Sequence, residues 1–399
     1  MKQLLLLLGL VFATQVCAQT ADFARGADVS WCTEMESDGK VFRNSEGVET
    51  ELFALMKQIG MTAIRLRVWV NPQQFGYGAW CDKADVVAKA KRAHAQGLDL
   101  MIDFHYSDFF ADPGTQTTPQ DWKDYSLEQL KTAMADYTKD VLQTLKEEGI
   151  EPRWVQVGNE TNSGMLHPLG KLDWNQSSTT RYNDYVALSN TGYDAVKEVL
   201  PQAQVIIHIG GTENADWFFQ DIKAAGAKFD MIGLSHYPTS GEWNSSSASA
   251  THSNINAAKW VSAAAEKFGV PVMICETGYE SWQPEKASEV MHDLMNRMKG
   301  ISQCAGVFYW EPEVDGVWKP AYYTEVGWGA YGMGAFSTEG RPTAALDAFG
   351  NESTDISTLP ADDDQPATWY DLQGRRNSYP TKGVMIVRQG YLIQKIIIK

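Results

Sequence analysis

Residues 127–158, LEQLKTAMADYTKDVLQTLKEEGIEPRWVQVG, contain the pattern that decides the fold of this chain. Apolar residues recur every three or four positions from Leu127 to Leu145, which predicts an amphipathic helix. Gly149 lies where glycine commonly ends a helix, and the apolar run Trp154–Gly158 then predicts a short strand. A helix followed by a buried strand is the unit from which parallel sheets are built.

The same unit recurs along the chain. Gly60, Gly97 and Gly269 mark further helix ends, and runs such as Val205-Ile206-Ile207 are apolar on successive residues, as in strands buried on both faces. No glycine-rich phosphate loop follows the first strand, which argues against a dinucleotide-binding fold. Eight such units predict a (β/α)₈ TIM barrel. The predicted strands are Ala24–Ser30, Ala63–Trp69, Leu98–Phe104, Trp154–Gly158, Gln204–Ile209, Met231–Ser235, Val272–Cys275 and Gly306–Trp310.

Both ends of the chain differ in character from this barrel, which we assign to residues 19–350. Residues 1–18 have a charged start, a short apolar run and small residues at a cleavage site, so they predict a secretion signal. A lipid anchor on Cys17 is the less favoured alternative. Residues 351–367 are rich in Ser, Thr, Asp and Pro and predict a linker, and residues 368–399 predict a small β-meander tail.

The charge composition of the chain limits the classes of molecule that it is expected to bind. Fifty acidic residues against 34 basic ones give a formal charge of −16, which disfavours nucleic acid and polyanions and favours a neutral substrate. Beyond the signal, no segment is long and apolar enough to span a membrane, and we expect a secreted, periplasmic or cell-surface monomer. The cysteines that remain beyond the signal are Cys32, Cys81, Cys275 and Cys304. In an oxidising compartment they could form up to two disulfides, with three possible connectivities, although a buried structural thiol is favoured for Cys275.

Two glutamates stand at predicted strand ends. Glu160 follows the fourth strand and Glu276 follows the seventh, so both are expected at the carboxyl-terminal mouth of the barrel. A single carboxylate there is as easily a capping or ion-paired residue. Two that face each other are what glycoside cleavage requires, because one donates a proton and the other attacks the anomeric carbon or activates water.

Other strand ends are also polar or aromatic, which is typical of a sugar-binding mouth. The second strand carries Arg65 and Arg67 on one face, and period alone does not decide which of them keeps Glu276 ionised. We predict substrate-binding residues at Asn159, Arg67, His105, Tyr106, Asp108, His236, Tyr237, Trp310 and Trp318.

Several of these stretches resemble family 53 endo-β-1,4-galactanases, within the large clan of retaining (β/α)₈ glycosidases. The resemblance rests on Gly26–Ser30, Arg65–Pro72, Asp103–Asp108, Val157–Glu160 and Glu276–Tyr279, and it spans residues 22 to 350. It implies that Glu160 is the acid/base and Glu276 the nucleophile. It also implies that Asn159 binds the sugar 2-hydroxyl, that Tyr237 orients the nucleophile, and that Trp310 forms the stacking floor.

The expected activity is therefore retaining endo-hydrolysis of β-1,4-galactan, the neutral side chain of pectin. No cofactor is expected, and the loop Glu313–Met333 lacks the oxygen-rich run of a calcium site, so no metal site is predicted. Two alternatives stay open, because a fold does not fix a substrate. One is a β-mannanase or β-glucanase on the same barrel, and the other is a non-catalytic glycan-binding protein.

Overall fold

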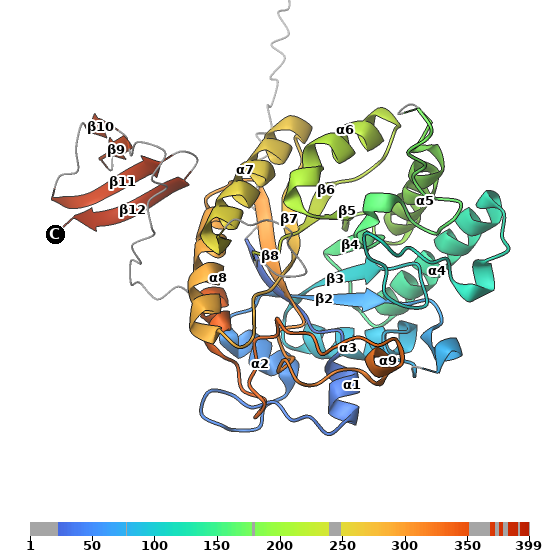
Figure 1. Ribbon diagram of the computed structural model, residues 1–399, viewed down its shortest axis with the longest axis horizontal. Helices are drawn as coiled ribbons and strands as arrows, with labels where there is room; N and C mark the ends of the chain where they lie inside the picture. The colour runs from blue at the N-terminus through green and yellow to red at the C-terminus, as the bar shows by residue number, and fades with distance from the viewer. Residues whose placement is uncertain are drawn as a thin grey trace, which may run out of the picture.

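Eight parallel strands close into a barrel in chain order (Figure 1). The computed structural model describes residues 23–76, 78–177, 180–238, 249–350, 368–371, 375–377, 382–389 and 392–398. The predicted TIM barrel is confirmed, and each predicted strand agrees with the structure within two residues at either end. The strands are β1 Ala24–Asp28, β2 Ala63–Val68, β3 Asp99–Phe104, β4 Trp154–Val157, β5 Gln204–Gly210, β6 Met231–Ser235, β7 Val272–Thr277 and β8 Cys304–Trp310.

Helices surround the barrel and return the chain from the end of each strand to the start of the next. Two of the glycines that were expected to end helices do so: Gly60 and Gly269 cap α2 and α7 in the left-handed region that favours glycine. The last strand is followed by short helices, of which η5 packs against α8. The helices are α1 Cys32–Ser37, α2 Leu52–Ile59, α3 Lys83–Ala95, α4 Leu127–Glu147, α5 Asn183–Val199, α6 Ala215–Ala224, α7 Ala250–Phe268, α8 Pro284–Lys299 and α9 Ala321–Glu325, with the 3₁₀ turns η1 Pro72–Phe75, η2 Gln120–Trp122, η3 Thr161–Ser163, η4 Thr212–Asn214 and η5 Ala344–Phe349.

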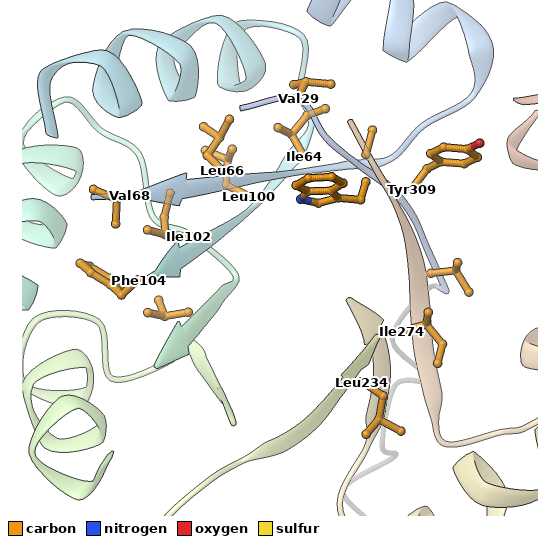
Figure 2. Close-up of a cluster of buried hydrophobic side chains, with 14 of the residues drawn as sticks. Val29, Ile64, Leu66, Val68, Leu100, Ile102, Phe104, Leu234, Ile274 and Tyr309 are labelled. Carbon is orange, nitrogen blue, oxygen red and sulfur yellow. The ribbon is translucent and has the colours of Figure 1, made fainter. Parts of the chain in front are cut away.

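Alternation along each strand divides the core in two. Side chains such as Leu66, Val68 and Ile102 lie outside the barrel, between the strands and the helices (Figure 2). The other face fills the barrel with a smaller cluster that includes Trp154 and Phe308. Gly26 makes room for the Phe308 ring, since a Cβ there would lie 2.1 Å from its Cδ1 atom. The lower barrel is therefore packed solid, and chemistry is confined to its upper end.

The tail forms a separate antiparallel sheet of β9 Thr368–Tyr370, β10 Arg376–Asn377, β11 Gly383–Gln389 and β12 Leu392–Ile398. Its strand order is β10-β9-β11-β12. The three strands expected in the tail correspond to β9, β11 and β12, which pair antiparallel in that order, and the short β10 adds at the free edge of β9. The predicted signal, residues 1–18, and the predicted linker, residues 351–367, lie outside the described residues.

The described residues contain none of the disulfides that the sequence left possible. Cys32, Cys81, Cys275 and Cys304 are all buried and free. Cys275 lies inside the barrel and Cys32 in the core outside it. The Cys81 thiol donates to the carbonyl oxygen of Ser30, and the Cys304 thiol donates to that of Gly306. Among the described helices, none combines the length and the apolar character that a bilayer crossing requires.

Candidate active site

The end of β4 aims Glu160 into the barrel mouth. Gly158 and Glu160 both adopt positive φ, at 86° and 45°, so the chain turns sharply just after the strand. A left-handed glutamate is strained, and such strain is typical of functional sites. Gly210, at the end of β5, leaves space for the carboxyl, because a Cβ there would lie 2.9 Å from Glu160 Oε1. The site is therefore shaped around this one side chain.

A bulge in β7 aims Glu276. Simple alternation would turn Cys275 inward and Glu276 outward, toward the helices. The pairing of β6 with β7 shifts at this point, where Leu234 pairs with Ile274 but Ser235 pairs with Glu276. Bulges of this kind redirect a side chain at the cost of local regularity. Glu276 thus points into the mouth, where it is 5% exposed.

Arg65 of β2 ties the two sides of the mouth together. Its Nη2 atom lies 2.9 Å from Glu276 Oε1 and donates to Asn159 Oδ1 at 2.8 Å. The same guanidinium pairs with Asp28 and Asp103, each at 2.7 Å. All of these groups are buried, so their hydrogen bonds are strong and their geometry is fixed.

The two glutamates interact electrostatically. Burial raises the pKa of both carboxyls, and the charge of Glu160 further raises the pKa of Glu276. Two like charges so placed cannot both ionise easily, so the pair tends to hold one proton. Arg65 opposes the rise at Glu276, and the Tyr237 hydroxyl donates to Glu276 Oε2 at 3.0 Å. The Arg65 guanidinium and the Tyr237 hydroxyl thus both favour the ionised form of Glu276.

Aromatic rings cluster at the end of β8 and in the loop that follows it. Trp310, at the end of β8, packs against Tyr331 at 4.6 Å and Trp31 at 5.3 Å between ring centroids. Trp318 packs edge-on against Trp31, and its Nε1 atom donates to Asp38 at 2.9 Å. Trp310 is therefore held rigidly by its neighbours, as a stacking surface requires.

The choice of Arg67 as the substrate-side arginine is corrected. Its guanidinium forms an ion pair with Glu311 and lies over the rings of Trp31, Trp69 and Phe110. It contacts neither catalytic candidate. Arg67 and Arg65 do share one face of β2, as predicted. They are two residues apart along the strand, and only Arg65 reaches Glu276, whereas Arg67 pairs with Glu311.

Three further predictions are corrected. Tyr106 stacks on Phe104, and its hydroxyl bonds to Thr138 of α4, so it lies behind the barrel wall. Asp108 accepts from the backbone N–H groups of Asn71 and Gln120, which makes it a loop-holding residue. The His236 imidazole faces Asn254 of α7 at 2.9 Å, although its backbone N–H donates to the Glu276 carbonyl oxygen.

His105 lies one step from the site. Its Nε2 atom is 3.0 Å from Asp103 Oδ2, and its Nδ1 atom accepts from the Ala111 N–H at 3.0 Å. The ring therefore joins β3 to the following loop and holds Asp103 against Arg65, so it supports the site rather than facing a sugar.

Sequence reasoning overlooked three residues of the upper barrel: Gln156, His208 and Ser235. His208 is fully buried. It bonds to Gln156 and to Ser235, and Ser235 donates to Glu160 Oε1 at 2.6 Å. The period-two pattern of β5, in which Ile206, His208 and Gly210 share one face, is the signal that would have placed it inside the barrel.

Within the described ranges, no three His, Cys, Asp or Glu side chains gather as a metal site would need. The closed barrel and the coupled glutamates at its carboxyl-terminal mouth define the class, which is that of the barrel glycoside hydrolases. The particular family follows from comparison. The model of glycosyl hydrolase family 53 matches residues 24–289, and the chain belongs to that family.

Named relatives and a solved structure agree with this placement. The chain is 32% identical to an arabinogalactan endo-beta-1,4-galactanase of Cellvibrio japonicus, with 74% of this chain and 81% of that protein covered. It is 29% identical to an endo-beta-1,4-galactanase of Bacillus subtilis, covering 88% and 85%. A solved fungal beta-1,4-galactanase superposes with a TM-score of 0.69 at 25% identity, over 81% of this chain and 98% of that one.

Proposed function

We propose that this protein is a retaining endo-β-1,4-galactanase, with Glu160 as acid/base and Glu276 as nucleophile. The observation that carries the proposal is the unequal environment of the two glutamates. Glu276 receives a guanidinium and a phenol hydroxyl, which favour a carboxylate. The family and the names of its galactanase relatives support galactan as the substrate.

The reaction proceeds by double displacement. The Glu276 carboxylate attacks the anomeric carbon while Glu160 gives its proton to the departing glycosidic oxygen, so a glycosyl-enzyme forms and the leaving chain departs neutral. Glu160, now ionised, takes a proton from water, and that water displaces Glu276 from the sugar. Two inversions leave the anomeric configuration unchanged. A separation of about 5–5.5 Å between the carboxyls is the prediction that belongs to this mechanism.

Two neighbours support binding at the cleaved bond. One N–H of the Asn159 amide donates to the Ala111 carbonyl oxygen at 2.8 Å, so its other N–H remains for the sugar 2-hydroxyl. The rigidly packed Trp310 ring offers an apolar face to the same sugar. A neutral polymer also suits a protein whose formal charge is −16.

The acid/base role is tested with Glu160→Ala. This variant is expected to lose nearly all cleavage of galactan but to turn over an aryl galactoside with a good leaving group when azide is added, giving a β-galactosyl azide. Glu160→Gln should still bind the polymer. An inverted product anomer by proton NMR, or an unaltered rate in either variant, would contradict the assignment.

A polysaccharide panel tests the substrate. Reducing-end release from β-1,4-galactan, mannan and cellulose, measured in parallel, is expected to occur with galactan. Release from mannan or cellulose alone would favour a β-mannanase or a β-glucanase. Measurable galactan affinity with no hydrolysis of any polymer would favour a glycan-binding protein that has lost its chemistry.

We also propose that the enzyme is exported, on the strength of the signal-like residues 1–18. A polymer too large to enter a cell must be cut outside the cytoplasmic membrane, which agrees with this placement. Amino-terminal sequencing of the mature protein is expected to begin after Ala18. A mature terminus at an acylated Cys17 would show lipid anchoring instead.

A further inference from the structure

We infer that a one-way chain of hydrogen bonds, which begins at Arg65 and ends on Oε1 of Glu160, reserves the other carboxyl oxygen, Oε2, for the catalytic proton. The inference rests on the acid/base role proposed for Glu160. It assigns a task to three buried residues of the upper barrel, Gln156, His208 and Ser235. They are positioning residues, and no proton travels along the chain.

The direction is set at its first link. Arg65 Nε donates to Gln156 Oε1 at 3.3 Å, and an arginine has no acceptor with which to reverse this bond. The Gln156 amide nitrogen then faces acceptors, namely the Gly158 carbonyl oxygen at 3.3 Å and Asn159 Oδ1 at 3.1 Å. A flipped amide would set its oxygen against both of these oxygens and its nitrogen against the guanidinium. The amide orientation is therefore fixed from both sides.

The second link fixes the tautomer of His208. Gln156 Nε2 lies 2.8 Å from His208 Nδ1, and because this amide nitrogen only donates, Nδ1 must accept. The ring is fully buried, and burial together with the nearby Arg65 charge lowers the pKa of His208 well below its usual range. The neutral imidazole thus carries its hydrogen on Nε2.

A contact between His208 and Asn159 would favour the opposite tautomer, but the other hydrogen bonds of these residues outweigh it. Asn159 Oδ1 also lies 3.0 Å from His208 Nδ1, and it would accept a hydrogen bond if the proton were on that nitrogen. This oxygen already accepts from Arg65 and from Gln156. The opposite tautomer would place a second donor against the Gln156 N–H at 2.8 Å, so it is disfavoured.

The last two links carry the direction to the acid. His208 Nε2 donates to Ser235 Oγ at 2.9 Å, which leaves the single hydroxyl hydrogen of Ser235 for Glu160 Oε1 at 2.6 Å. Oε1 thus accepts in both charge states of Glu160, and the acid proton is confined to Oε2. The same Oε2 then receives the proton of the attacking water, so the carboxyl does not need to rotate between the two half-reactions.

This arrangement also affects when Glu160 ionises. Burial raises the pKa of Glu160, whereas the Ser235 hydrogen bond lowers it. The charged groups that face this carboxyl are Asp112, Arg65, Asp103 and the other glutamate of the site, Glu276. His208 in turn faces Arg65, Asp103 and His105. Loss of the Ser235 hydroxyl leaves all of these charges in place, so its removal isolates the contribution of one hydrogen bond.

Nitrogen-15 NMR of the wild-type protein with labelled histidine tests the direction without any substrate. His208 is assigned by comparison with His208→Gln and is expected to show an unprotonated Nδ1 and a protonated Nε2 at pH 7. The reverse tautomer would overturn the inference, whatever the enzyme cleaves.

Steady-state kinetics test whether the Ser235 hydrogen bond supports proton donation by Glu160. Ser235→Ala is expected to lower kcat on galactan by about 10- to 150-fold, the range for a lost hydrogen bond to a charged group, with KM changed less than about twofold. The loss should be greater for aryl galactosides with poor leaving groups, and the basic limb of kcat/KM should move to higher pH. Ser235→Thr, which keeps the hydroxyl, should restore most of the rate.

Ser189→Ala is the matched control. Ser189 is a buried serine of α5 whose hydroxyl has no hydrogen-bond partner among the described atoms. Its loss should therefore leave kcat, the leaving-group dependence and the pH profile of kcat/KM unchanged. A Ser235→Ala enzyme with wild-type leaving-group dependence and pH profile would overturn the inference. Failure of azide to rescue Glu160→Ala would instead overturn the acid/base role itself, and the tautomer measurement separates these two failures.

Discussion

Arg65→Lys should damage catalysis far more than Arg67→Lys, although both arginines lie on β2 and are equally buried. Arg65 contacts five partners: Gln156, Asp28, Asp103, Asn159 and Glu276. A lysine ammonium has only three donors, so at least two partners are left unsatisfied. The lysine side chain is shorter and ends in a compact ammonium group, which cannot reach partners on strands β1, β3, β4 and β7 at the same time.

The magnitude follows from the contact with Glu276. A hydrogen bond to a charged group contributes about 1.5–3 kcal/mol, so its loss lowers kcat/KM by about 10- to 150-fold. The guanidinium also lowers the pKa of Glu276, so loss of the contact raises that pKa. The acidic limb of kcat/KM, where the nucleophile must be ionised, is therefore expected to move to higher pH.

The assay is reducing-end release from galactan across pH, with each rate divided by the folded fraction from circular dichroism. Arg67→Lys serves as the control, because Arg67 pairs with Glu311 and contacts neither glutamate of the site. Both variants should lose stability, since both leave buried acceptors unpaired. Equal losses of kcat/KM in the two folded variants, or a loss below about twofold in Arg65→Lys, would refute the reasoning.

Three further predictions concern single contacts. Tyr237→Phe removes the hydroxyl that donates to Glu276 at 3.0 Å and should lower kcat/KM by about 10-fold or more with the fold intact; an unchanged value would exclude a role for the hydroxyl. Gly210→Ala places a methyl 2.9 Å from Glu160 Oε1 and should cost about 100-fold in kcat by displacing the acid, whereas Gly114→Ala, with its nearest contact at 3.4 Å, should be neutral. Glu313 is buried beside Glu311, and burial raises the pKa of Glu313 well above its usual value. Such a group stabilises the fold below an unfolded pKa of about 4.3 and loses that contribution as pH rises through the folded pKa. Glu313→Gln should therefore gain about 1–3 kcal/mol over wild type at pH 8 but little at pH 4.5, as measured by urea unfolding; equal differences at both pH values would contradict this.

The sequence by itself determined the barrel and the strands that carry the chemistry. Strand positions agree within two residues because buried parallel strands are apolar on successive residues and glycines end the helices between them. Glu160 and Glu276 were singled out because they follow the fourth and seventh strands. These signals are local, since each depends on the order of residues within one short segment.

Only the tertiary structure decided how the side chains are directed. Alternation would turn Glu276 toward the helices, and a bulge in β7 turns it inward. Tyr106 immediately follows His105 yet faces α4, and Arg65 reaches Glu276 whereas Arg67 does not. Gln156, His208 and Ser235 come from three different strands, so their chain of hydrogen bonds has no trace in any one stretch of sequence. Partnership across a barrel depends on register and on backbone turns at strand ends, and neither is written in the period of a single strand.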